Sequence, residues 1–158
     1  MILSNANSLG LNVAFVGSTI NVLNKIRIKI SKEFPALKIC CTISPDYIFE
    51  SDPEKNIKLV NEVQNAKPDI LFLALGSPRQ EIWLSKYKDQ IGAKINIGVG
   101  AVFDFYSGTK TRSPAFLQKF GLEWLWRLFY EPGRLFKRYI ISDIPFFIKQ
   151  SFRIKFLR

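Results

Sequence analysis

Residues 69–75, with the sequence DILFLAL, form an almost unbroken apolar run that ends at Gly76. Such a run is typical of a strand that is buried on both faces of a parallel sheet. Gly76 permits a sharp turn, Ser77 is a helix-capping residue type, and Pro78 suits the first position of a helix. Gln80 follows Ser77 by three residues, which predicts a capping box. A helix that begins at the carboxyl end of a parallel strand presents its N–H groups to an anion, although a purely structural turn has the same sequence.

Signals for strands and helices alternate along the chain from residue 11 onward. Strands are predicted at residues 11–16, 37–43, 69–75 and 94–99, and helices at residues 19–34, 51–66 and 78–88. This alternation predicts an α/β fold with a parallel, doubly wound, Rossmann-like sheet and helices on both of its faces. The first ten residues are mostly polar and carry no clear signal, and a short strand-like run at residues 102–103 leads to Asp104.

Three of the predicted strands end in small or turn-forming residues. These are Gly17 and Ser18 after the first strand, Gly76 and Ser77 after the third, and Gly98 and Gly100 at the fourth. Because the carboxyl ends of parallel strands meet at one edge of the sheet, where ligands bind in such folds, the three turns together favour a nucleotide crevice. Each glycine taken alone fits an ordinary tight turn. The turns contain neither a Walker loop nor a Gly-x-Gly-x-x-Gly signature, which argues against ATP hydrolysis and NAD binding.

The residue composition narrows the chemistry that the chain can perform. There is no histidine, which removes the commonest general base and any histidine-ligated metal. There is also no Asp-x-Asp pair to hold a nucleotide-bound divalent cation, so we expect neither a metal nor another cofactor. Cys40 and Cys41 are adjacent in a predicted strand, where their side chains should point to opposite faces, and we expect two buried thiols with no bridge between them.

Positive charge is concentrated in the last third of the chain. Residues 1–109 hold 12 Lys and Arg against 10 Asp and Glu, whereas residues 110–158 hold 11 against 3. The second segment interleaves aromatic and isoleucine side chains with its basic ones, and Pro145 is expected to kink it. We therefore predict an α/β core over residues 1–109 and a basic, aromatic, helical appendage over residues 110–158 that contacts an anionic membrane surface and not nucleic acid. A basic helix packed on the core, with its charges in water, has the same composition.

Several sequence blocks, in order, carry a resemblance to a known family. They are LGSPRQE at residues 75–81, IGVGAVFD at 97–104, YSG at 106–108, TRSP at 111–114, GLEWLWR at 121–127, EPGR at 131–134 and KRY at 137–139. Over residues 11–139 the chain resembles the WecG/TagA/CpsF family of bacterial glycosyltransferases. The resemblance implies transfer of a sugar, typically N-acetylmannosamine, from a UDP donor to a polyprenyl-diphosphate-linked sugar in cell-surface polysaccharide or teichoic acid biosynthesis. It also implies a cytoplasmic protein that lies at the inner face of the plasma membrane.

The resemblance assigns roles to individual residues. Gln80 matches the glutamine of the family's site, which is compatible with its predicted capping role. Arg127, Arg134 and Arg138 match the C-terminal appendage that closes over the donor, where they would stabilise the departing diphosphate without a metal. Contact with lipid headgroups is the alternative role of these arginines. Gln80 and the three arginines are therefore the expected catalytic residues.

The turns at the sheet edge supply the expected substrate-binding residues. Tyr47 matches an aromatic block of the family, and Asp104 suits hydrogen bonding to ribose or uracil as well as the capping of a loop. The full set is Gly17, Ser18, Tyr47, Gly76, Ser77, Pro78, Glu81, Gly100 and Asp104. Together these residues are expected to hold the UDP-sugar donor at the carboxyl ends of the strands.

Members of the family usually carry a further segment before the point that matches Leu11. That segment includes the aspartate proposed as general base, so we expect this chain to represent the C-terminal part of the family fold and to transfer sugar slowly by itself. Three possibilities remain open. The chain could be a fragment of an interrupted gene, or a separate polypeptide could supply the base. The chain could also be a non-catalytic, membrane-associated subunit that binds UDP-sugars or assembles with other chains, including copies of itself.

Overall fold

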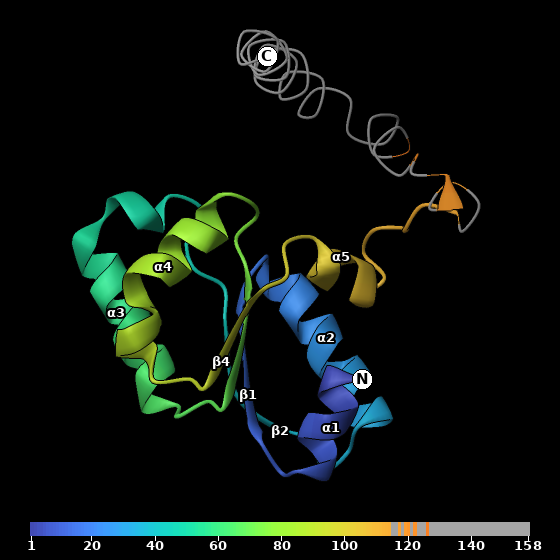
Figure 1. Cartoon of the computed structure of the whole chain (residues 1–158), viewed down its shortest axis with the longest axis horizontal. Coiled ribbons are helices and arrows are strands. Elements are labelled where there is room, and N and C mark those ends of the chain that lie inside the picture. Colours follow the sequence, from blue (N-terminus) through green and yellow to red (C-terminus); the bar gives the residue numbers. More distant parts are fainter. Residues whose placement is uncertain (115–116, 118, 121, 123–125, 127–158) are drawn as a thin grey trace, which may run out of the picture. The chain divides into compact units, whose positions relative to one another are not determined.

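The computed structural model describes residues 1–114 together with residues 117, 119, 120, 122 and 126. The chain divides into two compact units, Met1–Thr111 and Arg112–Arg158. The helices and strands defined below all belong to the first unit (Figure 1). The predicted helical appendage over residues 110–158 falls largely outside the described residues.

A four-stranded parallel sheet forms the centre of the first unit. Its strands are β1 (Asn12–Gly17), β2 (Lys38–Ile43), β3 (Ile70–Ala74) and β4 (Ile95–Gly98), in the spatial order β2-β1-β3-β4. The central strands β1 and β3 are buried almost throughout, as expected of their apolar sequences. The prediction of a parallel α/β fold is confirmed, and every strand begins and ends within one residue of its predicted bounds.

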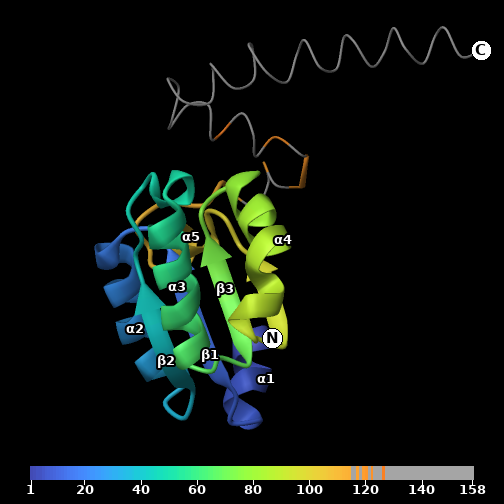
Figure 2. The same ribbon diagram turned by 90° about the vertical axis from the view of Figure 1, so that its left-hand side faces the viewer.

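Helices cover both faces of the sheet, as Figure 1 and Figure 2 show. One face is covered by α1 (Ile2–Ser8), α2 (Ile20–Glu33) and α5 (Val102–Tyr106). The other face is covered by α3 (Pro53–Asn65), α4 (Arg79–Ile91) and the short 3-10 turn η1 (Phe49–Ser51). Because both faces are covered, the carboxyl edge of the strands is the place where a ligand can approach the sheet.

Two of the helices begin at that edge with side-chain caps. The Thr19 hydroxyl accepts a hydrogen bond from the Val22 N–H at 3.4 Å at the start of α2. The Asp52 carboxylate accepts from the Glu54 and Lys55 N–H groups at 3.0 and 3.2 Å at the start of α3. These side chains satisfy N–H groups that the helices leave without partners, and they set the points at which α2 and α3 leave the edge.

Helix α1 is absent from the predicted elements. In the part of the chain that the structure describes, no side chain caps this seven-residue helix, and its first turn holds no acidic residue. Ala6 is buried, and Leu3 packs against the same core cluster beside the sheet. A helix this short is marginal alone, so its packing on the sheet stabilises it and its own sequence pattern gives little warning of it.

Cys40 and Cys41 correct a second expectation. Strand β1 pairs Val13 with Ile39 but Ala14 with Cys41, so β2 carries a bulge at Cys40. Both cysteines are free thiols that pack against the same core cluster. The prediction that they face opposite sides of the sheet is wrong, because the bulge interrupts the alternation of side chains. Burial raises the pKa of the Cys41 thiol to about 12, so this thiol is protonated at neutral pH.

Candidate functional site

The carboxyl ends of β1 and β3 approach each other too closely to leave room for a side chain. A Cβ atom added to Gly17 would lie 2.4 Å from the carbonyl oxygen of Ala74, and the φ angle of Gly17 is +105°. Glycine is the residue that meets both conditions. The contact continues at the next residue, because the Ser18 N–H donates to the same Ala74 oxygen at 3.0 Å. These two strand ends form a floor of backbone at the sheet edge.

Ser18 has a φ angle of +58°, a left-handed conformation that is uncommon for residues other than glycine. Its carbonyl oxygen accepts a hydrogen bond from the Ser44 hydroxyl at 2.7 Å. Its own hydroxyl donates to Oδ1 of Asp104 at 3.4 Å. Ser18 therefore joins the end of β1 to the segment after β2 and to α5, and uncommon backbone angles of this kind cluster at functional sites.

Asp104 was expected at the end of a strand-like run, but it lies within the short helix α5. The run at residues 102–103 is helical because tertiary contacts decide its conformation. Phe103 is buried in the core, and the Tyr106 hydroxyl donates to Glu33 of α2 at 2.6 Å. Besides its hydrogen bond to the serine, the Asp104 carboxylate lies 3.6 Å from Nζ of Lys110. The structure thus brings Asp104 to the sheet edge by way of α5.

Gln80 lies in the first turn of α4 and is only 5% exposed. Its Oε1 accepts a hydrogen bond from the Gly100 N–H at 2.9 Å, and its Nε2 donates to the Glu81 carboxylate at 2.9 Å. The predicted capping box is therefore wrong. Helix α4 begins at Arg79 with Pro78 at its N-cap position, and no side chain in the described part of the chain caps it. The hydrogen bond from Gln80 lowers the pKa of Glu81, because it stabilises the ionised carboxylate.

The turns after β3 and β4 are shaped around this buried amide. A Cβ atom added to Gly98 would lie 2.9 Å from Nε2 and 3.0 Å from Cδ of Gln80. Gly76, Ser77 and Pro78 connect β3 to α4, with Gly76 at a φ angle of +81° and a cis peptide bond between Ser77 and Pro78. The three predicted turn residues after β3 therefore set the position from which the Gln80 side chain reaches the end of β4.

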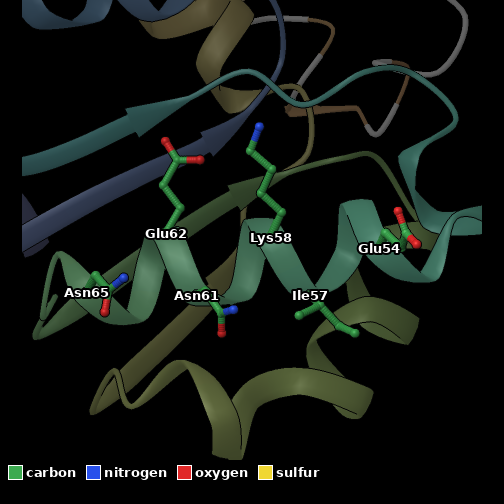
Figure 3. A pocket seen from close by; sticks show the side chains of 6 residues that line it. All are labelled: Glu54, Ile57, Lys58, Asn61, Glu62 and Asn65. Carbon is green, nitrogen blue, oxygen red and sulfur yellow. The ribbon is translucent and has the colours of Figure 1, made fainter.

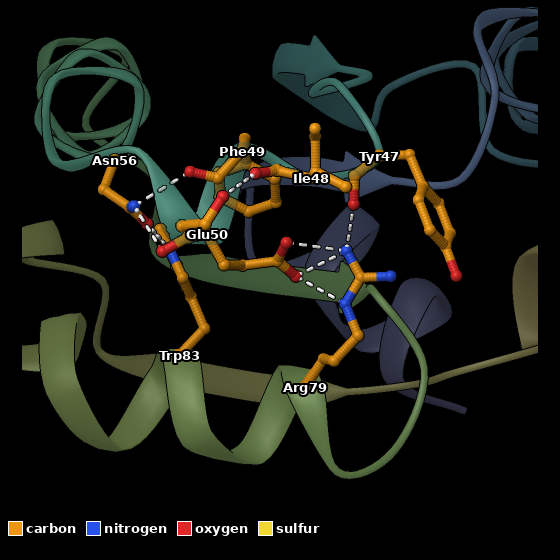
Figure 4. A network of polar contacts seen from close by, with 8 residues as sticks. Tyr47, Ile48, Phe49, Glu50, Asn56, Arg79 and Trp83 are labelled. Atoms are coloured by element: carbon orange, nitrogen blue, oxygen red, sulfur yellow. Dashed lines mark hydrogen bonds and ion pairs between the residues drawn. The ribbon is translucent and has the colours of Figure 1, made fainter.

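Arg79 forms a polar network with the segment that follows β2 (Figure 4). Its Nε donates to Oε1 of Glu50 at 2.6 Å, and one terminal nitrogen donates to Oε2 at 2.7 Å. The same terminal nitrogen donates to the backbone carbonyl oxygen of Tyr47, and the guanidinium carbon lies 4.6 Å from the centroid of the Tyr47 ring. The hydrogen bonds to Glu50 raise the pKa of Arg79. Tyr47 itself is 82% exposed.

A second polar connection of α4 joins Trp83 to Asn56 of α3, and neither residue is among the predicted site residues. Nε1 of Trp83 donates to Oδ1 of Asn56 at 2.9 Å, and both side chains are buried. The Asn56 amide nitrogen lies 2.7 to 3.1 Å from the backbone carbonyl oxygens of η1 and its cap, which belong to Phe49, Glu50 and Asp52. Asn56 is a polar residue on the otherwise apolar, buried face of α3, and this is the sequence signal that could have identified the contact.

A shallow hollow runs along the outer surface of α3, and Figure 3 shows its lining. The lining residues are Glu54, Ile57, Lys58, Asn61, Glu62 and Asn65. This set contains none of the residues predicted for the site. The hollow is therefore a separate surface feature, and it offers an internal comparison for binding experiments.

Arg127, Arg134 and Arg138, the predicted arginines of the appendage, lie outside the described residues. Within the part of the chain that the structure does describe, no three Cys, Asp or Glu side chains gather closely enough to hold a metal ion. Over those same residues, no helix combines the length and the apolar character that crossing a bilayer requires.

Ser18, Gln80, Gly100 and Asp104 form one group at the carboxyl edge, which we call the edge cluster. Gln80 is bonded to Gly100, Asp104 follows in the same turn and helix, and Ser18 bonds to Asp104. The cluster combines a hydroxyl, a carboxylate and a buried amide beside glycine backbone. Such groups suit the hydroxyl and amide groups of a sugar or a nucleoside, because each can donate to or accept from a neutral polar ligand.

Comparison with known proteins gives the chain a family context. The family described as "Glycosyl transferase WecG/TagA/CpsF family" matches residues 1–157. The chain is 29% identical over 133 residues to a protein of Bacillus spizizenii and 31% identical over 129 residues to one of Bacillus subtilis. These matches cover 84% and 82% of this chain but 49% and 48% of the relatives. A Staphylococcus aureus protein is 29% identical over 97 residues, which is 61% of this chain and 37% of that protein. All three relatives are named N-acetylglucosaminyldiphosphoundecaprenol N-acetyl-beta-D-mannosaminyltransferase, and the chain spans about half the length of the two Bacillus proteins.

Proposed function

The chain belongs to the WecG/TagA/CpsF glycosyltransferase family, and on this premise we propose that its sheet edge binds the UDP-sugar donor of an N-acetylmannosamine transfer reaction. The proposed acceptor is a sugar linked to a polyprenyl diphosphate, and the proposed product serves teichoic acid or other cell-surface polysaccharide synthesis. The shared name of the relatives supports both the transferred sugar and the lipid-linked acceptor.

The edge cluster is the observation that carries this proposal. Ser18 follows β1, Gln80 follows β3 and Asp104 follows β4, and these three strands are neighbours in the sheet, so one ligand at the edge would face residues from all three strand ends. We assign these side chains to the hydroxyl groups of ribose and of the donor sugar. Gly17 lets the end of β1 pack against β3, and the open space beside Gly76 lets the ligand come close to the backbone.

In the proposed reaction, the oxygen of an acceptor hydroxyl bonds to C1 of the donor sugar. The bond between C1 and the phosphate oxygen breaks, UDP leaves with the electron pair, and a base takes the proton of the hydroxyl. Charge therefore grows on the diphosphate as it leaves. We assign its stabilisation to Arg127, Arg134 and Arg138, because arginine forks hold diphosphate oxygens without a metal.

The carboxylates of the described site are poorly suited to act as the base. Glu81 is held by the Gln80 amide, which lowers its pKa and weakens it as a proton acceptor. Asp104 accepts from Ser18 and lies beside Lys110, which suits it to orient a ligand. We therefore propose that the 158-residue chain binds donor but turns it over slowly. The loss of a general base typically lowers a rate about a hundred- to ten-thousand-fold.

Isothermal titration of the 158-residue chain with UDP-N-acetylmannosamine tests donor binding. We expect a dissociation constant of about 1 mM or lower, weakened about tenfold by Gln80→Ala, which corresponds to roughly 1.4 kcal/mol. Asn61→Ala, in the hollow on α3, is the matched control and should bind as the parent chain does. Equal affinity for sulfate, or a loss of affinity in Asn61→Ala and not in Gln80→Ala, would contradict donor binding at the edge. Donor binding without measurable transfer to a lipid-linked acceptor would favour the binding-subunit alternative.

We also propose that residues 110–158 attach the chain to an anionic membrane surface, which places it at the inner face of the plasma membrane. The 11 Lys and Arg against 3 Asp and Glu in this segment support the proposal, because each basic residue near such a surface contributes about 1 kcal/mol. Sedimentation with phosphatidylglycerol vesicles should show binding that decreases with salt. Deletion of residues 140–158 should abolish that binding and leave some donor binding. Undiminished sedimentation of the deletion variant would contradict the proposal.

A further inference from the structure

Arg79 is a cation at the first position of α4, next to Gln80 of the edge cluster. An arginine at a helix start beside a sheet edge is a natural ligand for a diphosphate. Its contacts in the structure point to another use. Two of its nitrogens form a two-pronged bond with the Glu50 carboxylate, and one of these nitrogens also holds the Tyr47 carbonyl oxygen.

We infer that Arg79 and Glu50 are positioning residues, and that Arg79 does not bind the diphosphate. The pair fixes residues 44–48, which we call the Tyr47 segment, against α4 at the donor site. This inference rests on the proposed function and deepens it. Under this inference, the ion pair between Arg79 and Glu50 affects donor binding by holding Tyr47 in place. The side chains of Arg79 and Glu50 are about one-third and one-quarter exposed, so their charges are partly withdrawn from water and each depends on the other.

The Tyr47 segment needs such a hold, because the core does not hold its tip. Tyr47 and Ile48 are 82% and 68% exposed, whereas Phe49, the next residue, is 2% exposed. From Phe49 onward the chain is fastened by Asn56. Before the tip, Ser44 is fastened to Ser18 at the end of β1. The exposed tip between these two anchors is crossed by the Arg79 guanidinium, which meets both the carbonyl oxygen and the ring of Tyr47.

The ion pair also compensates the positive charge of Arg79 with the Glu50 carboxylate. The guanidinium is satisfied in one plane by the carboxylate, which is the geometry in which arginine and carboxylate bind most strongly. A diphosphate that bound the two paired nitrogens of Arg79 would have to displace Glu50 and leave its carboxylate without a partner beside a second negative group. The ion pair therefore shapes one side of the donor site, and other cations bind the phosphates.

The two roles of Arg79 predict opposite effects of Glu50→Gln. If Arg79 positions Tyr47, removal of the Glu50 charge loosens the segment, and the affinity for UDP falls about three- to tenfold. If Arg79 were a diphosphate ligand, the same substitution would free the guanidinium and raise the affinity. The matched control is Glu54→Gln, which removes the same charge from the first turn of α3 without touching the pair. It corrects for the change in net charge and should leave the affinity unchanged.

Titration of UDP against the full chain, its Glu50→Gln and Glu54→Gln variants, and the double charge swap Glu50→Arg with Arg79→Glu completes the test. The swap restores an ion pair between the two elements, so under our inference it binds UDP more tightly than Arg79→Glu alone. A diphosphate ligand moved to position 50 would give no such recovery. Thermal unfolding of every variant confirms that each one folds.

Hydrogen exchange without UDP separates this inference from the proposed function. Glu50→Gln should speed exchange in residues 44–48 and leave residues 12–17 of β1 unchanged. Faster exchange together with weaker UDP binding supports the inference. Unchanged exchange, or equal or tighter UDP binding by Glu50→Gln, overturns it. If the parent chain binds no UDP, the proposed function and the donor role of the pair both fail, while the exchange result still decides whether the pair holds the segment.

Discussion

The contact between Gly98 and Gln80 makes a prediction whose size can be worked from the structure. The methyl group of Gly98→Ala would lie 2.9 Å from Nε2, 3.0 Å from Cδ and 3.2 Å from Cγ of Gln80, all closer than the roughly 3.5 to 4.0 Å of an ordinary carbon contact. Since the Gln80 side chain is buried, it can move only by giving up its hydrogen bond to the Gly100 N–H. Overpacking of this kind lowers the free energy of unfolding by about 1–3 kcal/mol.

A double-mutant cycle isolates this contact. Gln80→Ala alone removes the partner of the Gly100 N–H and should lower the free energy of unfolding by about 1–3 kcal/mol. Gly98→Ala made in the Gln80→Ala background places its methyl group in the space that the glutamine has left, so the second substitution should add less than about 0.5 kcal/mol. Urea unfolding of the three variants at one temperature measures each value. Additive losses, within about 0.5 kcal/mol, would refute the reasoning that both substitutions act on one side chain.

Two further predictions concern a buried polar contact and an ion pair. Trp83→Phe removes the donor to Oδ1 of buried Asn56 and should lower the free energy of unfolding by about 1–3 kcal/mol in urea unfolding; a loss below about 0.5 kcal/mol would show that the hydrogen bond is unimportant. Asp69 accepts hydrogen bonds from Lys94 at 2.8 Å and from the Asn12 N–H at 2.9 Å, and these bonds lower its pKa in the folded state. Its stabilising contribution is therefore present above the unfolded pKa of about 3.9 and is lost as the pH falls through the lower, folded pKa. Asp69→Asn should flatten the loss of stability below about pH 4, and an unchanged profile of the denaturation midpoint against pH would contradict this assignment.

The strands were predictable because their signal is local. The apolar run at residues 69–75 needs burial on both faces, and only the centre of a covered parallel sheet offers it, which is where β3 lies. The strand-like run at residues 102–103 is helical in the structure for the opposite reason. Five residues are too few to specify a helix by themselves, and the anchoring of Phe103 and Tyr106 on other elements decides the conformation.

The roles of site residues were harder to predict than their positions. Gln80 was expected to matter, but the local spacing from Ser77 suggested a cap, whereas its real partner, the Gly100 N–H, lies 20 residues along the chain. Spacing within one turn carries no information about such a contact. Arg79 shows the same limit, because its partner Glu50 is 29 residues away and belongs to a different strand-to-helix connection. Pairings between loops are set by the order of the strands, which only the assembled sheet reveals.

The backbone floor at Gly17 and Ala74 has a consequence for redesign of donor specificity. No side chain fits between these two strand ends, so a mutant library that varies Gly17 should return mainly unfolded proteins. In the proposed site, the walls around the floor are the Tyr47 segment and the connection between β4 and α5. Tyr47 and Ile48 are exposed and can be exchanged, whereas Gly100 has a φ angle of +52° and should stay glycine. A directed-evolution campaign for a different sugar nucleotide should therefore keep the floor and Gly100 constant and diversify the exposed positions of the walls.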